Sequence, residues 1–299
     1  MRNIRTDLAL EAREIWQEDA GEQTKLLGVI AHEEKVRGHT VHRVDITNEK
    51  GAESLGKPIG RYVTVELSGV ARREDEVFPR AIKTVADELK NIMPQSDGCV
   101  LVVGLGNRGI TPDAVGTCSV ENVMVTRHLV ENLPEYFGSY RRVSAIAPGV
   151  LGMTGVESRE IISGVAQKVT PECIIVIDAL ASRKISRLCN TIQITDTGII
   201  PGSGVGNARA AINKETLGTP VIAIGVPTVV DISAIIADIS SESGCDFPEH
   251  IMEEYCESLM VTPKEIDVRI SDVGKIIGYA INAALHPELS LADIDAFLS

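Results

Sequence analysis

Val100-Leu-Val-Val-Gly-Leu-Gly-Asn-Arg-Gly-Ile-Thr-Pro-Asp-Ala-Val-Gly116 is the stretch that decides the fold of this chain. It opens with four branched apolar residues, a run typical of a strand buried on both faces of a sheet. The backbone then turns at Gly104 and Gly106, and Asp113 follows a proline where a helix is predicted to begin. A second stretch, Cys173-Ile-Ile-Val-Ile-Asp178, again places a carboxylate directly after a buried strand.

These two carboxylates are the candidate catalytic residues. Ligands of open parallel sheets bind in the crevice beyond the carboxyl ends of the strands, so Asp113 and Asp178 are expected to face one cleft. Two such carboxylates share one proton, because like charges at close range do not both ionise. The ionised member can activate water while the protonated member donates to a carbonyl or a leaving amine, which suits peptide hydrolysis. Taken singly, either acid could instead cap a helix or a turn.

Composition limits the class of protein. With 299 residues, 44% hydrophobic and 3% aromatic, the chain can build a core mostly from Ile, Val, Leu and Ala. The formal charge of −13 repels nucleic-acid phosphate, so we expect no direct nucleic-acid binding, while a basic protein substrate would be attracted. No apolar run spans a bilayer and no apolar signal core opens the chain, which predicts a cytoplasmic protein without membrane contact. Six scattered cysteines without Cys-x-x-Cys spacing favour reduced, buried thiols.

Strands and helices alternate regularly after residue 97. Predicted strands cover residues 98–103, 142–147, 173–177, 191–195 and 219–225, and predicted helices cover residues 114–131, 158–168, 230–241 and 263–285. This alternation predicts an α/β fold with a mostly parallel sheet and helices on both faces. No linker is recognisable, so residues 8–299 are expected to form a single α/β domain.

The residues ahead of this alternation form an N-terminal elaboration. A short helix is predicted from Asp7 to Asp19, and a second helix from Arg73 to Met93 has its apolar positions on one face. Residues 40–47 and 61–67 alternate as strands around a turn-rich stretch. Residues 40–70 therefore predict a hairpin-like β extension.

Three loops at predicted strand ends are rich in glycine: residues 104–109, 148–155 and 195–207. Such loops let backbone amides approach a ligand closely, or permit motion. The third loop is long and comes shortly after the Asp178 strand, a natural position for a cleft wall or a lid. The candidates for substrate-binding or lid residues within these loops are Gly106, Asn107, Asp196, Gly202, Ser203 and Gly204.

Two further sequence patterns concern nucleotide binding and metal binding. Gly104-x-Gly106-x-x-Gly109 matches a dinucleotide fingerprint, so a nucleotide-binding regulatory protein is one alternative. No acid ends the next strand at residues 142–147, however, as that fingerprint requires. His39 and His42 fall on opposite faces of an alternating strand, which favours solvated histidines over a metal site.

Ten motifs, in order over nearly the whole chain, carry a family resemblance. They are Arg5-Thr-Asp-Leu-Ala9, Gly104-Leu-Gly-Asn107, Thr111-Pro-Asp-Ala-Val-Gly116, Ala147-Pro-Gly-Val-Leu-Gly-Met-Thr-Gly155, Ile177-Asp-Ala-Leu180, Thr195-Asp-Thr-Gly198, Pro201-Gly-Ser-Gly-Val-Gly-Asn207, Ile224-Gly-Val-Pro-Thr-Val-Val-Asp231, Thr262-Pro-Lys264 and Asn282-Ala-Ala-Leu-His286. Together they resemble the spore germination protease family, aspartic-type endopeptidases of endospore-forming bacteria.

The resemblance implies an endopeptidase that starts the degradation of small acid-soluble spore proteins at germination, in the cytoplasm of the spore core. The family's catalytic carboxylates match Asp113 and Asp178. The family is made as a zymogen, which cleaves itself after an acid that precedes an apolar residue and Ala, with a further acid two residues beyond. Asp7-Leu8-Ala9-Leu10-Glu11 fits this site. Residues 1–7 would thus be a propeptide, and residues 8–299 the peptidase domain of a homo-oligomer, implied to be a tetramer.

The implied phosphorylase/hydrolase-like fold is similar to that of hydrogenase maturation endopeptidases, which arrange two acids and a histidine around nickel. A metal-dependent maturation endopeptidase is therefore an alternative. No histidine lies between Asp178 and His250, which departs from that pattern, so we expect neither a metal nor a cofactor. A catalytically silent protein that binds spore proteins is a further alternative, which the paired acids disfavour.

Two hypotheses concern activation and recognition. In the zymogen, the N-terminal segment or the loop at residues 195–207 is expected to lie over the cleft, so that removal of residues up to Asp7 opens it. An acid beside the scissile bond needs a basic partner. Arg183 and Lys184, with Arg187 nearby, follow Asp178 and are the candidates, with solvated surface charge as the alternative interpretation.

Overall fold

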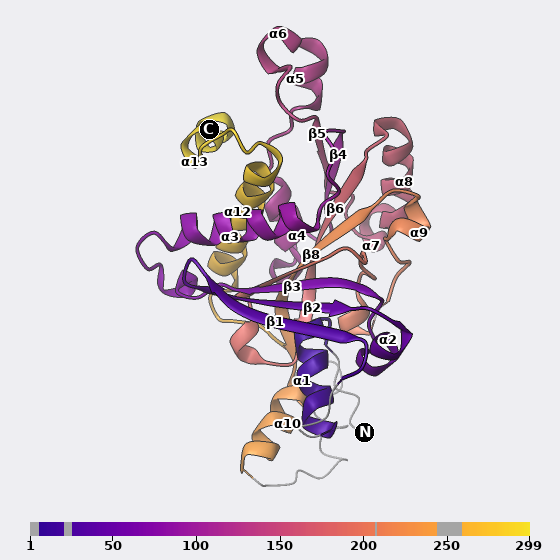
Figure 1. The fold of residues 1–299 in the computed structure, drawn as a ribbon, viewed down its shortest axis with the longest axis vertical. Helices are drawn as coiled ribbons and strands as arrows, with labels where there is room; N and C mark the ends of the chain where they lie inside the picture. The colour runs from indigo at the N-terminus through magenta and orange to yellow at the C-terminus, as the bar shows by residue number, and fades with distance from the viewer. Residues whose placement is uncertain (1–5, 21–25, 207, 244–258) are drawn as a thin grey trace.

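The computed structural model describes residues 6–20, 26–206, 208–243 and 259–299, and builds them around one nine-stranded sheet (Figure 1). The strands are β1 (Val29–Val36), β2 (His39–Ile46), β3 (Gly60–Glu66), β4 (Val100–Gly104), β5 (Val143–Ile146), β6 (Cys173–Ser182), β7 (Thr191–Thr195), β8 (Val221–Asp231) and β9 (Met260–Val261). Their order is β1-β2-β3-β7-β8-β6-β4-β5, and β9 pairs with β8 off this path.

Helices in the described part of the chain surround this sheet. They are α1 (Ala9–Ala20), α2 (Glu49–Leu55), α3 (Val77–Ile92), α4 (Val115–Val120), α5 (Arg127–Asn132), α6 (Pro134–Phe137), α7 (Leu151–Thr154), α8 (Ser158–Val169), α9 (Lys214–Leu217), α10 (Ile232–Ser243), α12 (Ile266–Leu285) and α13 (Leu291–Leu298). Short 3₁₀ turns add η1 (Val70–Arg72), η2 (Thr111–Asp113), η3 (Ile185–Arg187) and η4 (Ser203–Val205). None of the described helices is both long enough and apolar enough to cross a membrane.

The sheet is mixed. β5, β4, β6 and β8 are parallel neighbours, whereas β1, β2, β3, β7 and β9 pair antiparallel. The α/β class is confirmed, but the expectation of a parallel strand is wrong for β7, which pairs antiparallel with both of its neighbours. The link from β6 to β7 covers only residues 183–190, and a parallel crossover needs about a dozen residues or more. β7 therefore runs antiparallel to β8.

Residues 40–70 continue the main sheet. β2 pairs antiparallel with β3, and β3 pairs with β7, so the predicted pair of strands joins the sheet directly. The stretch between them, expected to be a turn, contains α2, which Asn48 caps by accepting a hydrogen bond from the amide of Gly51. β1 was not predicted because its residues are exposed on both faces, so its sequence lacks an apolar alternation.

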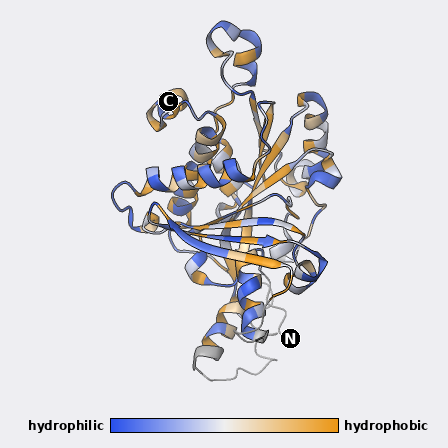
Figure 2. Ribbon diagram, in the orientation of Figure 1, coloured by the Kyte–Doolittle hydropathy of each residue, from blue (hydrophilic) through white to orange (hydrophobic). Residues whose placement is uncertain are grey.

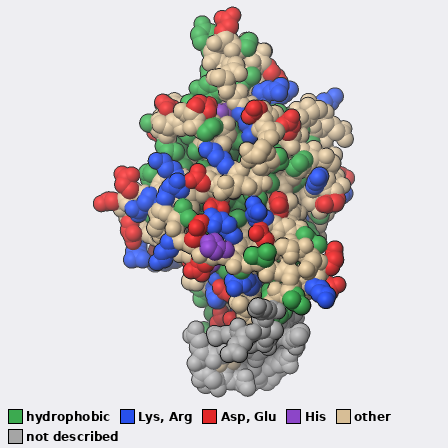
Figure 3. Space-filling view, viewed as in Figure 1, with side chains coloured by type: hydrophobic (Ala, Val, Ile, Leu, Met, Phe, Trp, Pro, Cys, Tyr) green, Lys and Arg blue, Asp and Glu red, His purple; other side chains and the backbone are tan. Residues whose placement is uncertain are grey.

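Helices pack on both faces of the parallel strands, as predicted. Val100 and Val102 of β4 point to a core that contains residues of α3, α4 and α12. Leu101 and Val103 point to the opposite face, where Ile162 of α8 packs against them. Figure 2 shows the resulting concentration of apolar residues on the central strands, and Figure 3 shows acidic and basic side chains interspersed over one surface.

The helix predicted over residues 114–131 is divided into α4 and α5. Side-chain hydrogen bonds hold the segment between them away from helical geometry. Thr126 donates to the carbonyl oxygen of Arg141 and accepts from the amide of Val143, and Asn282 of α12 accepts from the amide of Met124. Such bonds compete with the helical ladder, which explains the interruption.

Candidate active site

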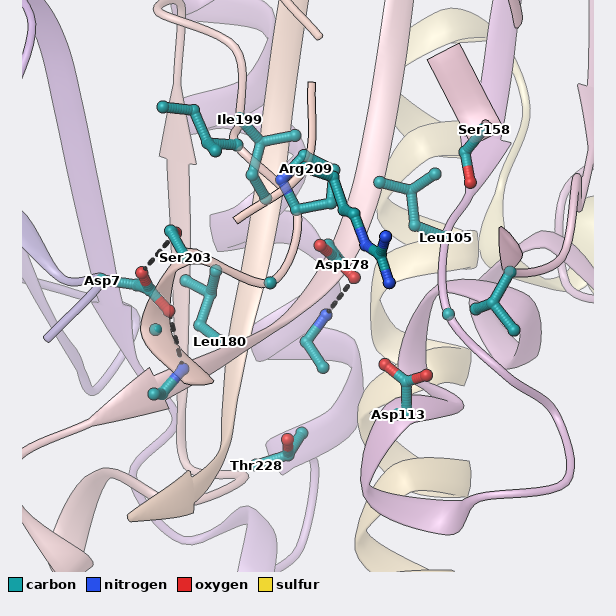
Figure 4. A pocket seen from close by; sticks show the side chains of 18 of the residues that line it. Asp7, Leu105, Asp113, Ser158, Asp178, Leu180, Ile199, Ser203, Arg209 and Thr228 are labelled. Atoms are coloured by element: carbon teal, nitrogen blue, oxygen red, sulfur yellow. Dashed lines mark hydrogen bonds between the residues drawn. The ribbon is translucent and has the colours of Figure 1, made fainter. Parts of the chain in front are cut away.

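A cavity of about 580 Å³ opens at the carboxyl ends of β4, β6 and β8 (Figure 4). This is where ligands bind in open α/β sheets. Its walls come from the loop after β4, the end of β6, the segment from α7 to the start of α8, and the loop at residues 195–213. Asp113 and Asp178 both line it, so the structure brings together the two acids that the sequence predicted to share a cleft.

A tight turn positions Asp113. Its Oδ2 accepts a hydrogen bond from the amide of Asn107, at 2.8 Å. Gly106 adopts a φ of +96°, and a Cβ placed there would lie 1.9 Å from the carbonyl oxygen of Asp113, so only glycine fits. Burial raises the pKa of Asp113 above its usual value, against the lowering effect of the Asn107 amide.

Asp178 is the more strongly perturbed acid. It lies on β6, is 6% exposed, and its Oδ1 accepts a hydrogen bond from the amide of Ala179 at 2.9 Å. Burial, followed by the negative charges of Asp113 and then Asp7, raises the pKa of Asp178 to about 8. This shift favours the protonated form of the carboxyl group at neutral pH.

Glycines permit the close packing that brings the two acids together. A Cβ on Gly104 would lie 2.2 Å from the carbonyl oxygen of Gly116, and a Cβ on Gly116 would lie 2.5 Å from that of Ile177. The start of α4 thus rests directly on the ends of β4 and β6. This contact places η2, which carries Asp113, beside the strand that carries Asp178.

Asp7 lies in the same cavity. Its Oδ2 accepts from the amide of Ala181 and its Oδ1 from the hydroxyl of Ser203, both at 2.9 Å. Its own amide donates to the carbonyl oxygen of Ala181 at 3.1 Å. Gly204 lies against this carboxylate, since a Cβ there would come within 2.0 Å of Asp7 Oδ2. Figure 4 shows Asp7 joined to Ser203 at the edge of the cavity, with Asp178 further in.

Two further side chains, those of Lys57 and Gln193, hold the peptide bond between Asp7 and Leu8. The carbonyl oxygen of Asp7 accepts from Lys57 Nζ at 3.1 Å and from Gln193 Nε2 at 3.3 Å, and Leu8 is fully buried. Burial lowers the pKa of Lys57, against the opposing charges of Asp7 and Glu11. Sequence patterns did not mark Lys57 or Gln193, because their contacts depend on where the N-terminal segment docks.

The two predicted basic residues after β6 lie outside the cavity lining. Arg183 forms ion pairs with Glu18 at 2.8 Å and with Asp238 at 3.0 Å. Lys184 Nζ lies 2.8 Å from Glu14. Their charges therefore have partners on α1 and α10 in this structure, and the predicted contact with substrate stays a prediction.

The remaining predicted loop residues divide between the cavity and its surroundings. Gly106, Gly202, Ser203 and Gly204 line it. Asn107 contributes its backbone amide to Asp113, whereas its side chain accepts from the amide of Gly109 at 2.9 Å. Asp196 is directed to β3, where it accepts from the amide of Arg61 at 2.8 Å.

The cavity lining, within the part of the chain that the structure describes, contains no histidine and no cysteine. Across the same residues, no group of three or more His, Cys, Asp and Glu side chains is arranged to hold a metal ion. His39 and His42, on β2, lie away from the cavity. His39 is buried, at 1% exposure, so the expectation of a solvated histidine is wrong for it. His250 falls outside the described residues.

The sequence is similar to a named family over most of its length. The Germination protease family model matches residues 9–242. The germination protease of Caldanaerobacter subterraneus subsp. tengcongensis is 43% identical over 99% of this chain and 98% of its own length. That of Clostridium perfringens is 44% identical over the whole of both chains, and that of Priestia megaterium is 40% identical over 99% of this chain and 97% of its own length.

A solved structure gives a much weaker match. The [NiFe] hydrogenase maturation protease HycI from Thermococcus kodakarensis KOD1 covers 65% of this chain and 99% of its own, with 16% identity and a TM-score of 0.36. That likeness is too low to carry the metal chemistry of HycI over to this chain. The sequence relatives support a germination endopeptidase over a metal-dependent maturation enzyme or a nucleotide-binding protein. This chain belongs to the germination protease family of peptidases.

Proposed function

We propose that Asp113 and Asp178 together hydrolyse the peptide bond. The carrying observation is that two carboxyl groups, Asp113 on η2 and Asp178 on β6, line one cavity in which burial raises the pKa of Asp178 to about 8. In this proposal ionised Asp113 takes a proton from the attacking water. Protonated Asp178 donates to the carbonyl oxygen or the leaving amine, the division of roles expected when two environments separate a pair of pKa values.

The proposed substrates are small acid-soluble spore proteins, degraded in the spore core at germination. The family name and the protease relatives support a protein substrate. We further propose that the chain works as a homotetramer and binds no nucleic acid directly, in keeping with its formal charge of −13. Light scattering of the purified protein would give its subunit number.

The N-terminal residues are proposed to block the site. Asp7 occupies one end of the cavity and hydrogen bonds to Ser203 of the glycine-rich loop, so the segment and the loop hold each other over the site. Self-cleavage between Asp7 and Leu8 would release residues 1–7 as a propeptide and leave residues 8–299 as the active domain. Leu8 is fully buried, so this bond has to leave its present position to be cut.

The test is hydrolysis of a purified small acid-soluble spore protein by chains carrying Asp113→Asn or Asp178→Asn. Each change is expected to lower the rate by about 10²- to 10⁴-fold and to stop self-cleavage, because each removes one partner in proton transfer. Asp97→Asn, at an exposed acid outside the cavity, is the matched control. Near-normal turnover by either variant would remove that residue from the proposal. Loss of activity with a chelator, restored by nickel or zinc, would favour the metal-dependent alternative.

A further inference from the structure

Two arginines line the cavity that contains Asp113 and Asp178. Arg159 lies in the first turn of α8, and Arg209 lies in the loop between η4 and α9. Among the described lining residues, these two are the sole arginine or lysine side chains. Figure 4 shows the Arg209 side chain extending into the cavity, on the side where Asp178 and Asp113 lie.

Neither guanidinium group forms a hydrogen bond to a carboxylate in the described part of the chain. Arg209 Nη1 lies 3.7 Å from Glu157 Oε1, beyond hydrogen-bond range, and both side chains are partly exposed. The Arg159 side chain forms no ion pair or hydrogen bond with any residue in the described ranges. Arg187, by contrast, pairs with both Glu11 and Glu14. The two guanidinium groups in the cavity are therefore only weakly paired with carboxylates of the cavity walls.

This charge has a physical consequence for an acidic ligand. An entering carboxylate would meet the negative charges of Asp113 and Glu157, and in low-dielectric surroundings that repulsion is strong. With Asp178 protonated and Asp7 removed, the two arginines balance these two acids. The planar guanidinium group also matches a carboxylate with two parallel hydrogen bonds, which makes it selective for an acid over an amide.

We infer that Arg159 and Arg209 determine specificity by binding the acidic side chain of a peptide substrate beside the scissile bond. Ile110 and Ile200, exposed at the same cavity, offer an apolar surface to the neighbouring residue of the peptide. This inference rests on the proposed peptidase function. It assigns recognition to side chains on α8 and the loop before α9, in place of Arg183 and Lys184.

The test compares two peptides cleaved by the processed protein. One contains the chain's own Thr6–Glu11 sequence, and the other has Asn in place of the acid that corresponds to Asp7. The double variant Arg159→Gln, Arg209→Gln is expected to lower kcat/KM for the acidic peptide by about 10- to 100-fold, as for the loss of hydrogen bonds to a charged group. The ratio of kcat/KM for the acidic peptide to kcat/KM for the amide peptide should fall toward one.

Controls separate recognition from folding. Lys168→Gln removes an exposed charge at the far end of α8 and should keep the wild-type ratio. Arg159→Lys with Arg209→Lys keeps the charge without the planar fork, so it should retain part of the preference. Thermal unfolding of every variant checks that the chain is folded.

Two results would overturn the inference. One is an unchanged preference for the acidic peptide in the folded double variant. The other is an equal loss on both peptides, which would assign the arginines to catalysis or stability and not to specificity. If the unaltered processed protein cleaves neither peptide, nor a spore protein, the proposed function itself fails, and that outcome is distinct from both.

Discussion

At the residue scale, the two candidate acids differ because their surroundings stabilise charge unequally. Carboxylates with low pKa values accept two or three backbone hydrogen bonds, whereas Asp113 and Asp178 each accept one. One amide does not offset burial, and Asp178 is the more buried. The shared proton is therefore expected to remain on Asp178, which leaves Asp113 as the base.

The first prediction is the pH dependence of hydrolysis. We expect kcat/KM to fall above about pH 8, as Asp178 loses its proton, and to fall in acid, as Asp113 gains one at a pKa raised above its usual value. The two apparent pKa values belong to the coupled pair. Initial rates on one peptide from pH 4 to pH 10 would measure them; a profile that stays level from neutral pH to pH 10 contradicts the assignment of Asp178 as the acid.

The second prediction concerns stability. The pKa of Asp178 is raised in the folded state from 3.8 to about 8, so the folded protein holds a proton that the unfolded chain releases. This contribution to stability is complete below about pH 4 and is lost as pH rises to about 8. Asp178→Asn should therefore make the decrease in Tm between about pH 4 and about pH 8 smaller, and it should raise Tm at pH 8. Thermal unfolding measured at several pH values tests it, and an unchanged slope would count against the burial effect.

Sequence could identify the acids but not their neighbours in the cavity. Asp113 follows β4 and Asp178 lies in the second half of β6, so a general rule for parallel sheets places them near the carboxyl ends of the strands. Arg209 stands in a glycine-rich loop whose path no periodicity encodes, and Arg159 resembles any surface charge on an amphipathic helix. Lys57 contacts the carbonyl oxygen of Asp7, which lies 50 residues earlier in the chain. Local sequence patterns do not reveal a contact between residues so far apart.

At the scale of elements, the turn between β4 and η2 sets the position of Asp113. The third prediction is that Gly106→Ala destabilises this turn, because a Cβ would clash with the carbonyl oxygen of Asp113 and the φ of +96° is strained for alanine. Displacement of the carboxyl group should lower kcat more than KM. Gly164→Ala, in α8, meets nothing within 4 Å and is the control, expected to leave activity near wild type and to raise Tm slightly, because Ala favours a helix more than Gly does.

The topology was predicted correctly for the parallel strands and was missed for β7. Alternating strands and helices after residue 97 correctly gave the parallel group of β4, β5, β6 and β8. The eight-residue link before β7 is too short for a crossover, so its antiparallel direction could have been inferred from loop length alone. The break between α4 and α5 depends on tertiary hydrogen bonds to Asn282, which sequence periodicity does not show.

At the scale of the whole molecule, the N-terminal segment contacts both the cavity, through Asp7, and the link between β6 and β7, through Glu11. Leu8, Ala9 and Leu10 are buried, and the Glu11 carboxylate is fully enclosed. Glu11 accepts from the Ser182 hydroxyl and the amides of residues 183 and 184, and it pairs with Arg187 at 3.0 Å. α1 is thereby anchored to the link between β6 and β7. The proposed cut after Asp7 removes the Thr6 hydroxyl, which also donates to Glu11, but leaves these other partners in place, since they follow the scissile bond.

The fourth prediction tests whether processing opens the cavity without loosening the fold. A chain that begins at Leu8 should keep a Tm close to that of the full chain, because it gives up the contacts of Thr6 and Asp7 and retains the other partners of Glu11. Glu11→Ala should lower the free energy of unfolding by about 3 kcal/mol, since it leaves the Ser182 hydroxyl and two buried amides without their acceptor and leaves Arg187 with Glu14 alone. Glu18→Ala, at a half-exposed pair with Arg183, should cost less than about 1 kcal/mol. If the shortened chain unfolds as readily as Glu11→Ala, residues up to Asp7 support the fold itself, and their removal cannot serve as a simple release of the cavity.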